Sequence, residues 1–147
     1  KTFILKNSFM TTKSSGFSLI ELLVVVAILG IIASIGIVSY TGYVSGAKRK
    51  SAENVMQQIS LGQTEYYSDN GTYYRDSNNS NCGPTSATST AIETNLLGGS
   101  DNINDEMGYQ LCIADDSSNY KVIATETGGG SCKISMSALN VITRTNC

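Results

Sequence analysis

GFSLIELLVVVAILGIIASIGIV, residues 16–38, is an apolar run with a single charged residue, Glu21. As an α-helix, the part after Gly16 spans about 33 Å, and the hydrocarbon core of a bilayer is about 30 Å thick. The run is longer than the apolar stretch of a secretory signal peptide, and no small-residue cleavage site follows it. We therefore expect a membrane-spanning helix over residues 17–38.

The flanks of this run predict its orientation. Three lysines precede it, Lys1, Lys6 and Lys13, and a chain rich in carboxylates follows it. Basic residues tend to stay on the cytoplasmic side of a membrane. Residues 1–16 are therefore expected in the cytoplasm, and the C-terminal part is expected outside.

The helical pattern continues past the apolar run. Apolar residues recur there at spacings of three and four, which places them on one face of a helix: Val44, Ala47, Ala52, Val55, Met56, Ile59 and Tyr66. Asn70-Gly71 then supplies a stop, because both residues tolerate the left-handed conformation of a helix C-terminus. The pattern predicts one helix from about Phe17 to about Ser68.

Three later segments predict a sheet: YQLCIAD (109–115), YKVIATE (120–126) and CKISMSA (132–138). Each alternates apolar and polar residues between turn residues, as antiparallel strands do. Residues 75–108 are expected to form a long exposed connection with one helical turn near residues 91–97. The apolar face of the sheet needs a cover, and the striped half of the helix is the candidate. We expect an α+β fold, a long N-terminal helix packed on three or four antiparallel strands.

The four cysteines, Cys82, Cys112, Cys132 and Cys147, lack the spacing of a metal or redox site. An even number in an exported chain predicts two disulfides. Of the three possible pairings, the order along the chain favours Cys82 with Cys112 and Cys132 with Cys147. No metal and no cofactor is expected.

Charge and composition argue against two classes of function. The chain has 10 basic and 12 acidic residues, and three of the basic ones lie before residue 17. Strong nucleic-acid binding is not expected, because it requires clustered Lys and Arg, and the one basic cluster is Lys48-Arg49-Lys50. The chain has no histidine, phosphate loop or nucleophile elbow, so we do not expect an enzyme.

The motif GFSLIE (16–21), which leads directly into the apolar run, resembles the N-terminus of type IV pilins and pseudopilins. The resemblance implies cleavage between Gly16 and Phe17 by a prepilin peptidase, which also methylates the new Phe17 amine. It divides the chain into a leader (1–16), a transmembrane and filament-core helix (17–38) and an extracellular pilin domain (39–147). That domain includes the second half of the helix.

The C-terminal part carries a weaker resemblance. GGSCKISM (129–136), with Cys147 at the end, is similar to minor pilins of the type IVa class and to major pilins with a C-terminal disulfide-bounded loop. The chain departs from the family at Val38, where many members have a proline that kinks the helix.

Glu21 has two interpretations. It could be a first-turn carboxylate, since negative charge is favourable at a helix N-terminus. A carboxylate in lipid, however, costs several kcal/mol unless it is paired, and cleavage would leave the α-amine of Phe17 as the nearby cation. We expect Glu21 to pair with the N-terminus of a neighbouring subunit during assembly.

The resemblance implies a structural subunit of a type IV pilus that serves adhesion, twitching motility or DNA uptake. Its partners would be other pilin subunits, the prepilin peptidase and methyltransferase, the inner membrane and the pilus assembly machinery. Two alternatives remain. A type II secretion pseudopilin commonly lacks disulfides, and a DNA-binding minor pilin would need a basic surface stripe. After residue 50 the chain has eleven acidic residues and only four basic ones, which are Arg75, Lys121, Lys133 and Arg144.

Overall fold

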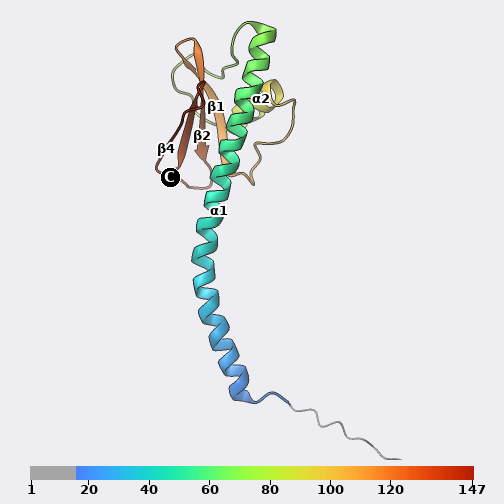
Figure 1. The fold of residues 1–147 in the computed structure, drawn as a ribbon, viewed down its shortest axis with the longest axis vertical. Helices are drawn as coiled ribbons and strands as arrows, with labels where there is room; N and C mark the ends of the chain where they lie inside the picture. Colours follow the sequence, from blue (N-terminus) through green and yellow to red (C-terminus); the bar gives the residue numbers. More distant parts are fainter. Residues whose placement is uncertain (1–15) are drawn as a thin grey trace, which may run out of the picture. The chain divides into compact units, whose positions relative to one another are not determined.

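The computed structural model describes residues 16–147 and divides into two compact units, one ending at Thr41 and the other comprising Gly42–Cys147. All of the predicted leader except Gly16 lies outside the described residues. The elements, labelled in Figure 1, are α1 (Leu19–Asn70), α2 (Ser86–Leu96), β1 (Tyr109–Asp116), β2 (Asn119–Glu126), β3 (Lys133–Ser137) and β4 (Ile142–Thr145). Gly42–Cys147 is called the head below.

The described part of the first unit contains one element, the beginning of α1. Its most apolar 18-residue window has a mean hydropathy of 2.9 and is not buried by the rest of the chain. The helix runs without interruption through Gly36 and Val38. Val38 stands where many pilins have a proline, and the backbone hydrogen bonds of the helix continue through this position. By length and composition this helix can cross a membrane.

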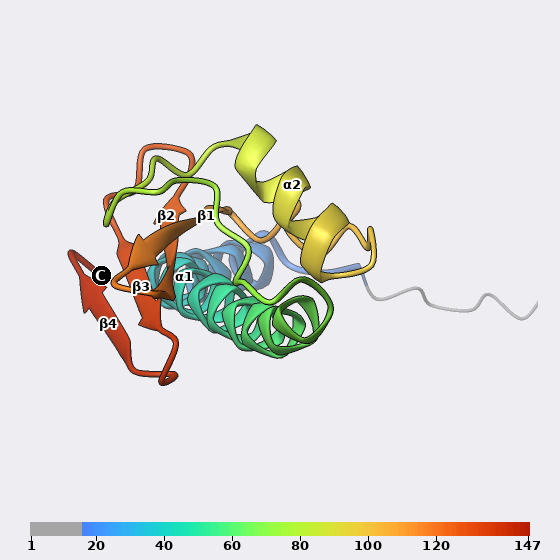
Figure 2. The same cartoon turned by 90° about the horizontal axis from the view of Figure 1, so that it is seen from above.

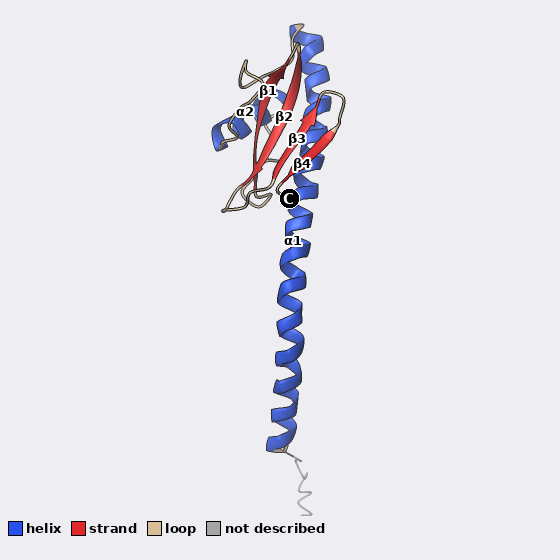
Figure 3. Ribbon diagram, turned by 90° about the vertical axis from the view of Figure 1, so that its left-hand side faces the viewer, coloured by secondary structure: helices blue, strands red, loops and turns tan. Residues whose placement is uncertain are grey.

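The sheet of the head is antiparallel throughout, with the strand order β1-β2-β3-β4. The three predicted strands are confirmed, with ends that differ by at most one residue. The fourth strand, β4, was not located by sequence analysis because ITRT is short and mostly exposed. Figure 3 shows the four strands side by side against α1.

The core of the head lies between the sheet and α1. Figure 2 shows these two layers from above. Ala52, Val55, Met56 and Ile59 recur at helical spacing on α1 and are buried. They meet the inward face of the sheet, which consists of fully buried residues from three strands: Leu111, Ile113, Val122, Ala124, Ile134 and Met136. The predicted α+β fold is confirmed, with the striped half of the helix covering the sheet.

The segment before the sheet contributes more to the core than the sequence suggested. Thr85 caps α2 with its side chain, and Ile92 and Leu96 of this helix are buried. A Cβ atom at Gly62 on α1 would lie 2.3 Å from the carbonyl oxygen of Leu96. Glycine is therefore required at position 62 for the end of α2 to approach α1.

Two disulfides secure the head. Cys82 is bonded to Cys112 and Cys132 to Cys147, the pairing that the chain order favours, with Cα–Cα distances of 6.2 and 4.4 Å. The second bond fastens the C-terminus to the start of β3.

Candidate assembly segment and surfaces of the head

Gly16, Phe17 and Ser18 precede α1 and are exposed, so the predicted cleavage position lies outside any regular element. Ser18 and Glu21 cap the helix reciprocally. The Ser18 N–H donates to Glu21 Oε2 at 3.1 Å, and the Glu21 N–H donates to Ser18 Oγ at 3.2 Å. This arrangement is a capping box, which satisfies two backbone donors of the first helical turn.

In the uncleaved chain, Glu21 caps the N-terminus of its own helix. Its carboxylate accepts from the backbone one residue after Phe17, so it already lies close to the atom that cleavage would turn into an amine. The geometry brings Phe17, Ser18 and Glu21 together in one chain. Contact with a neighbour's N-terminus stays a prediction.

The outward faces of β2, β3 and β4 form a second surface of interest. Because side chains alternate along a strand, the residues between the buried positions point away from α1. This outward sheet face carries two lysines and five hydroxyl residues: Lys121, Thr125, Lys133, Ser135, Ser137, Thr143 and Thr145. Ile123, between Lys121 and Thr125 on β2, lies on the same side and is buried in a small cluster with Cys112 and Cys82. The carboxylate of Glu126 belongs to the inward side, where it accepts from the Cys132 N–H at 3.4 Å.

The lysines of this face differ from most other cations of the head. Arg75 pairs with Asp115. Lys50 and Arg144 both pair with Glu53. Within residues 16–147, neither Lys121 nor Lys133 makes an ion pair or a side-chain hydrogen bond. The sequence contains both lysines, but their position on one face follows from the alternation of β2 and β3 together with the strand register.

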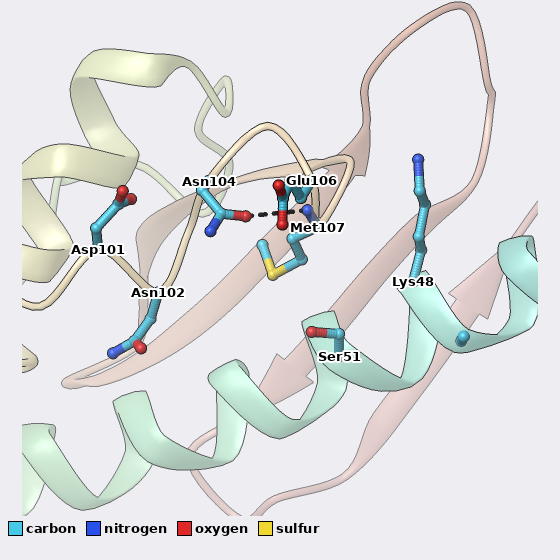
Figure 4. Close-up of a pocket in the computed structure, with 8 residues that line it drawn as sticks. Lys48, Ser51, Asp101, Asn102, Asn104, Glu106 and Met107 are labelled. Atoms are coloured by element: carbon cyan, nitrogen blue, oxygen red, sulfur yellow. Dashed lines mark hydrogen bonds between the residues drawn. The ribbon is translucent and has the colours of Figure 1, made fainter.

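The basic cluster of α1 does not join this face. The side chain of Lys48 lies against Gly108, where an added Cβ would be 3.2 Å from Lys48 Cδ. Lys48 and Ser51 line a cleft of about 430 Å³ opposite the segment that precedes β1, seen in Figure 4. Asp101 and Glu106 line the same cleft, so its charge is mixed.

Glu53 is the most constrained carboxylate of α1. Its side chain is 6% exposed, and Arg144 Nε of β4 donates to its Oε1 at 2.6 Å. This charge-assisted hydrogen bond holds the pKa of Glu53 below its usual value, against the opposing effect of burial. The pair ties the last strand to the helix.

The end of α1 carries a group of tyrosines. The ring centroids of Tyr67 and Tyr73 are 4.7 Å apart, and those of Tyr73 and Tyr120 are 5.0 Å apart. Nearby, Asp76 accepts from the Ile113 N–H at 2.7 Å, and burial raises the pKa of this carboxyl. These contacts attach the segment after α1 to β1 and β2.

Comparisons with known proteins identify the family. Residues 11–37 match the prokaryotic N-terminal methylation motif, and residues 38–135 match the family described as type IV minor pilin ComP, DNA uptake sequence receptor. Searches of curated proteins and of solved structures found no match. The second match covers about two thirds of the chain.

These matches, the apolar helix and the disulfide-linked α+β head establish a type IV pilus subunit. The chain is a membrane-anchored precursor that is processed, assembled with other pilins and displayed in an extracellular pilus. The protein belongs to the type IV minor pilin ComP family, whose members are structural subunits.

Proposed function

We propose that this subunit binds DNA at the pilus surface and takes part in DNA uptake. The observation that carries the proposal is the match of residues 38–135, most of the head, to a family described as a DNA uptake sequence receptor. The negative charge of the chain after residue 16 predicts that binding by one subunit is weak and sensitive to salt.

The outward sheet face supplies the part of the head that suits a polyanion. Lys133 lies opposite Thr125, four residues beyond Lys121 on β2, so the two lysines are about 13 Å apart along the strands. Their ammonium groups are not engaged by carboxylates, and the hydroxyls of Ser135 and Thr143 between them can donate to phosphate oxygens. Among the residues of the four strands, Asp116 at the turn end of β1 is the carboxylate on the outward side.

Two phosphate contacts set the expected salt dependence. The logarithm of the binding constant should fall with the logarithm of salt concentration with a slope of about −2, since each contact contributes about −0.9. Contacts of this kind position DNA and carry no sequence information, so any preference among sequences has to come from base contacts.

Binding of a fluorescent duplex to the purified full chain in detergent, measured over a range of salt concentrations, tests this proposal. Lys121→Gln and Lys133→Gln should each reduce the slope by about one. Asp116→Asn should strengthen binding. Lys50→Gln removes a lysine that is already paired with Glu53 and serves as the matched control. Binding with a slope that neither lysine variant changes would reject the sheet face, and absence of binding would reject the function.

We also propose the processing steps in residue terms. The peptidase cuts between Gly16 and Phe17, the Phe17 amine is methylated, and residues 17–38 pass from the inner membrane into the filament core with the head outside. The exposed, irregular backbone around the cleavage position and the matched methylation motif support this assignment. After cleavage, Glu21 exchanges its capping contact for the Phe17 amine of a neighbour.

A further inference from the structure

The connection between β3 and β4 holds two aliphatic side chains in water. Leu139 is 84% exposed and Val141 is 61% exposed. Asn140, between them, has a positive φ of 59°. The Asn140 N–H donates to the Ser137 carbonyl at 2.9 Å, and the Ser137 N–H donates to the Val141 carbonyl at 3.1 Å. The turn is closed by its own backbone and presents both side chains outward.

A third exposed aliphatic residue lies next to this turn. Leu61 of α1 is 74% exposed and lines a groove of about 280 Å³ together with Gln57, Ser60 and Asn140. Ser60 is fixed there, because the Tyr120 hydroxyl is 2.9 Å from its Oγ. Figure 3 shows the β3–β4 connection beside α1. Leu61, Leu139 and Val141 are called the aliphatic corner below.

The residues of the aliphatic corner and its groove are uncharged, which bears on the kind of partner that could cover them. No Asp or Glu occurs after Glu126, and the three aliphatic residues and the other groove residues are uncharged. The head of this chain has seven basic and eleven acidic residues, so its close contact with another acidic head is favoured where charge is absent. Exposed apolar groups on a preformed turn also lose little conformational entropy on binding.

We propose that the aliphatic corner docks against the head of a neighbouring pilin subunit in the filament. The proposal rests on the membership of this chain in a pilin family and is independent of DNA binding. The side chains of Leu139 and Val141 would be buried by the neighbour, and the groove beside Leu61 would receive one of its apolar side chains.

Charge substitution tests the contact in cells. The double variant Leu139→Lys with Val141→Lys places two ammonium groups in the contact, and its share in sheared filaments should fall at least about tenfold while its membrane level is unchanged. The double variant Thr90→Lys with Thr94→Lys adds the same charge at two exposed positions of α2 and should still be incorporated. Equal incorporation of both double variants would overturn the proposal.

Photocrosslinking keeps the proposal testable if the charged variant fails to fold. A photoreactive phenylalanine analogue in place of Leu139 should crosslink to a pilin subunit in intact filaments. The same analogue in place of Thr90, an exposed residue of α2, reports indiscriminate crosslinking. Adducts to lipid or to a protein other than a pilin, or equal adducts from both positions, would contradict the assignment.

Discussion

The two units of the chain differ in the exposure of their apolar residues. In the first unit, Phe17 and Leu19 are 86% and 84% exposed, whereas Met56 and Ile59 of the head are fully buried. Burial of a side chain of this size is worth about 1.5–3 kcal/mol. The head gains this from its own sheet, and the first unit can gain it only from lipid or from other subunits. Substitutions in the first unit should therefore affect assembly, and substitutions in the head should affect folding.

Glu21→Ala should give the largest effect and tests the first half of this comparison. Loss of the partner for a buried amine should lower incorporation into sheared filaments at least about tenfold, while membrane level and head stability stay unchanged. Glu65→Ala, which removes an exposed carboxylate of the same helix within the head, is the control. If Glu21→Ala, expressed as the sole copy, were incorporated normally, the pairing role would be wrong and Glu21 would only cap its own helix.

Cys147→Ser should act on the head alone. The Cys132–Cys147 bond closes a loop with a sequence separation of 15, and its loss should lower the free energy of unfolding by about 3 kcal/mol on a chain-entropy estimate. Chemical unfolding of the purified full chain in detergent would measure this, with the helical signal of the first unit persisting past the transition. A change below about 1 kcal/mol would show that the bond is not important for stability.

Two glycine substitutions with the same chemistry should differ in sign. Gly62→Ala forces a methyl group against the Leu96 carbonyl and should destabilise the head by about 1–3 kcal/mol. Gly46→Ala adds the same methyl group on the same helix with nothing within 4 Å, and should stabilise it by up to about 1 kcal/mol. Thermal unfolding of both variants would reveal the sign, and equal effects would contradict the close approach of α2.

The sequence predicted the larger features of the head because each has its own local signal. The helix stripe, the alternation of three strands and the cysteine order do not depend on distant partners. β4 and the buried side of α2 do depend on them. Ile142–Thr145 is held by pairing with β3, by the Arg144 contact with Glu53 and by the last disulfide, and none of these is visible in four residues.

The candidate surfaces followed the same division. GFSLIE (16–21) is a local motif and could be read directly, although its capping box was not predicted. Predicting the outward sheet face requires the strand register, because the pairing of Thr125 with Lys133 places the two lysines on the same face of neighbouring strands. The aliphatic corner could not be predicted, because Leu61 and Asn140 are far apart in the sequence and meet only in the folded head.

The smallest predicted effect is a pH dependence of head stability from Glu53. Its pKa is lowered in the folded state, so its contribution is present above the unfolded value, near 4.5, and is lost as the pH falls through the folded value. The free energy of unfolding should be lower for Glu53→Gln than for wild type at pH 7, and the difference should shrink below pH 4.5. A difference that is independent of pH would contradict the ion pair with Arg144, and Glu65→Gln provides the exposed control.

Intact-mass analysis of sheared pili tests whether this chain is a cleaved subunit inside a filament. We expect a species that begins at Phe17, carries one methyl group on its amine and retains both disulfides. A species that retains residues up to Gly16, a chain cut after Val38, or absence of the protein from purified pili would contradict it.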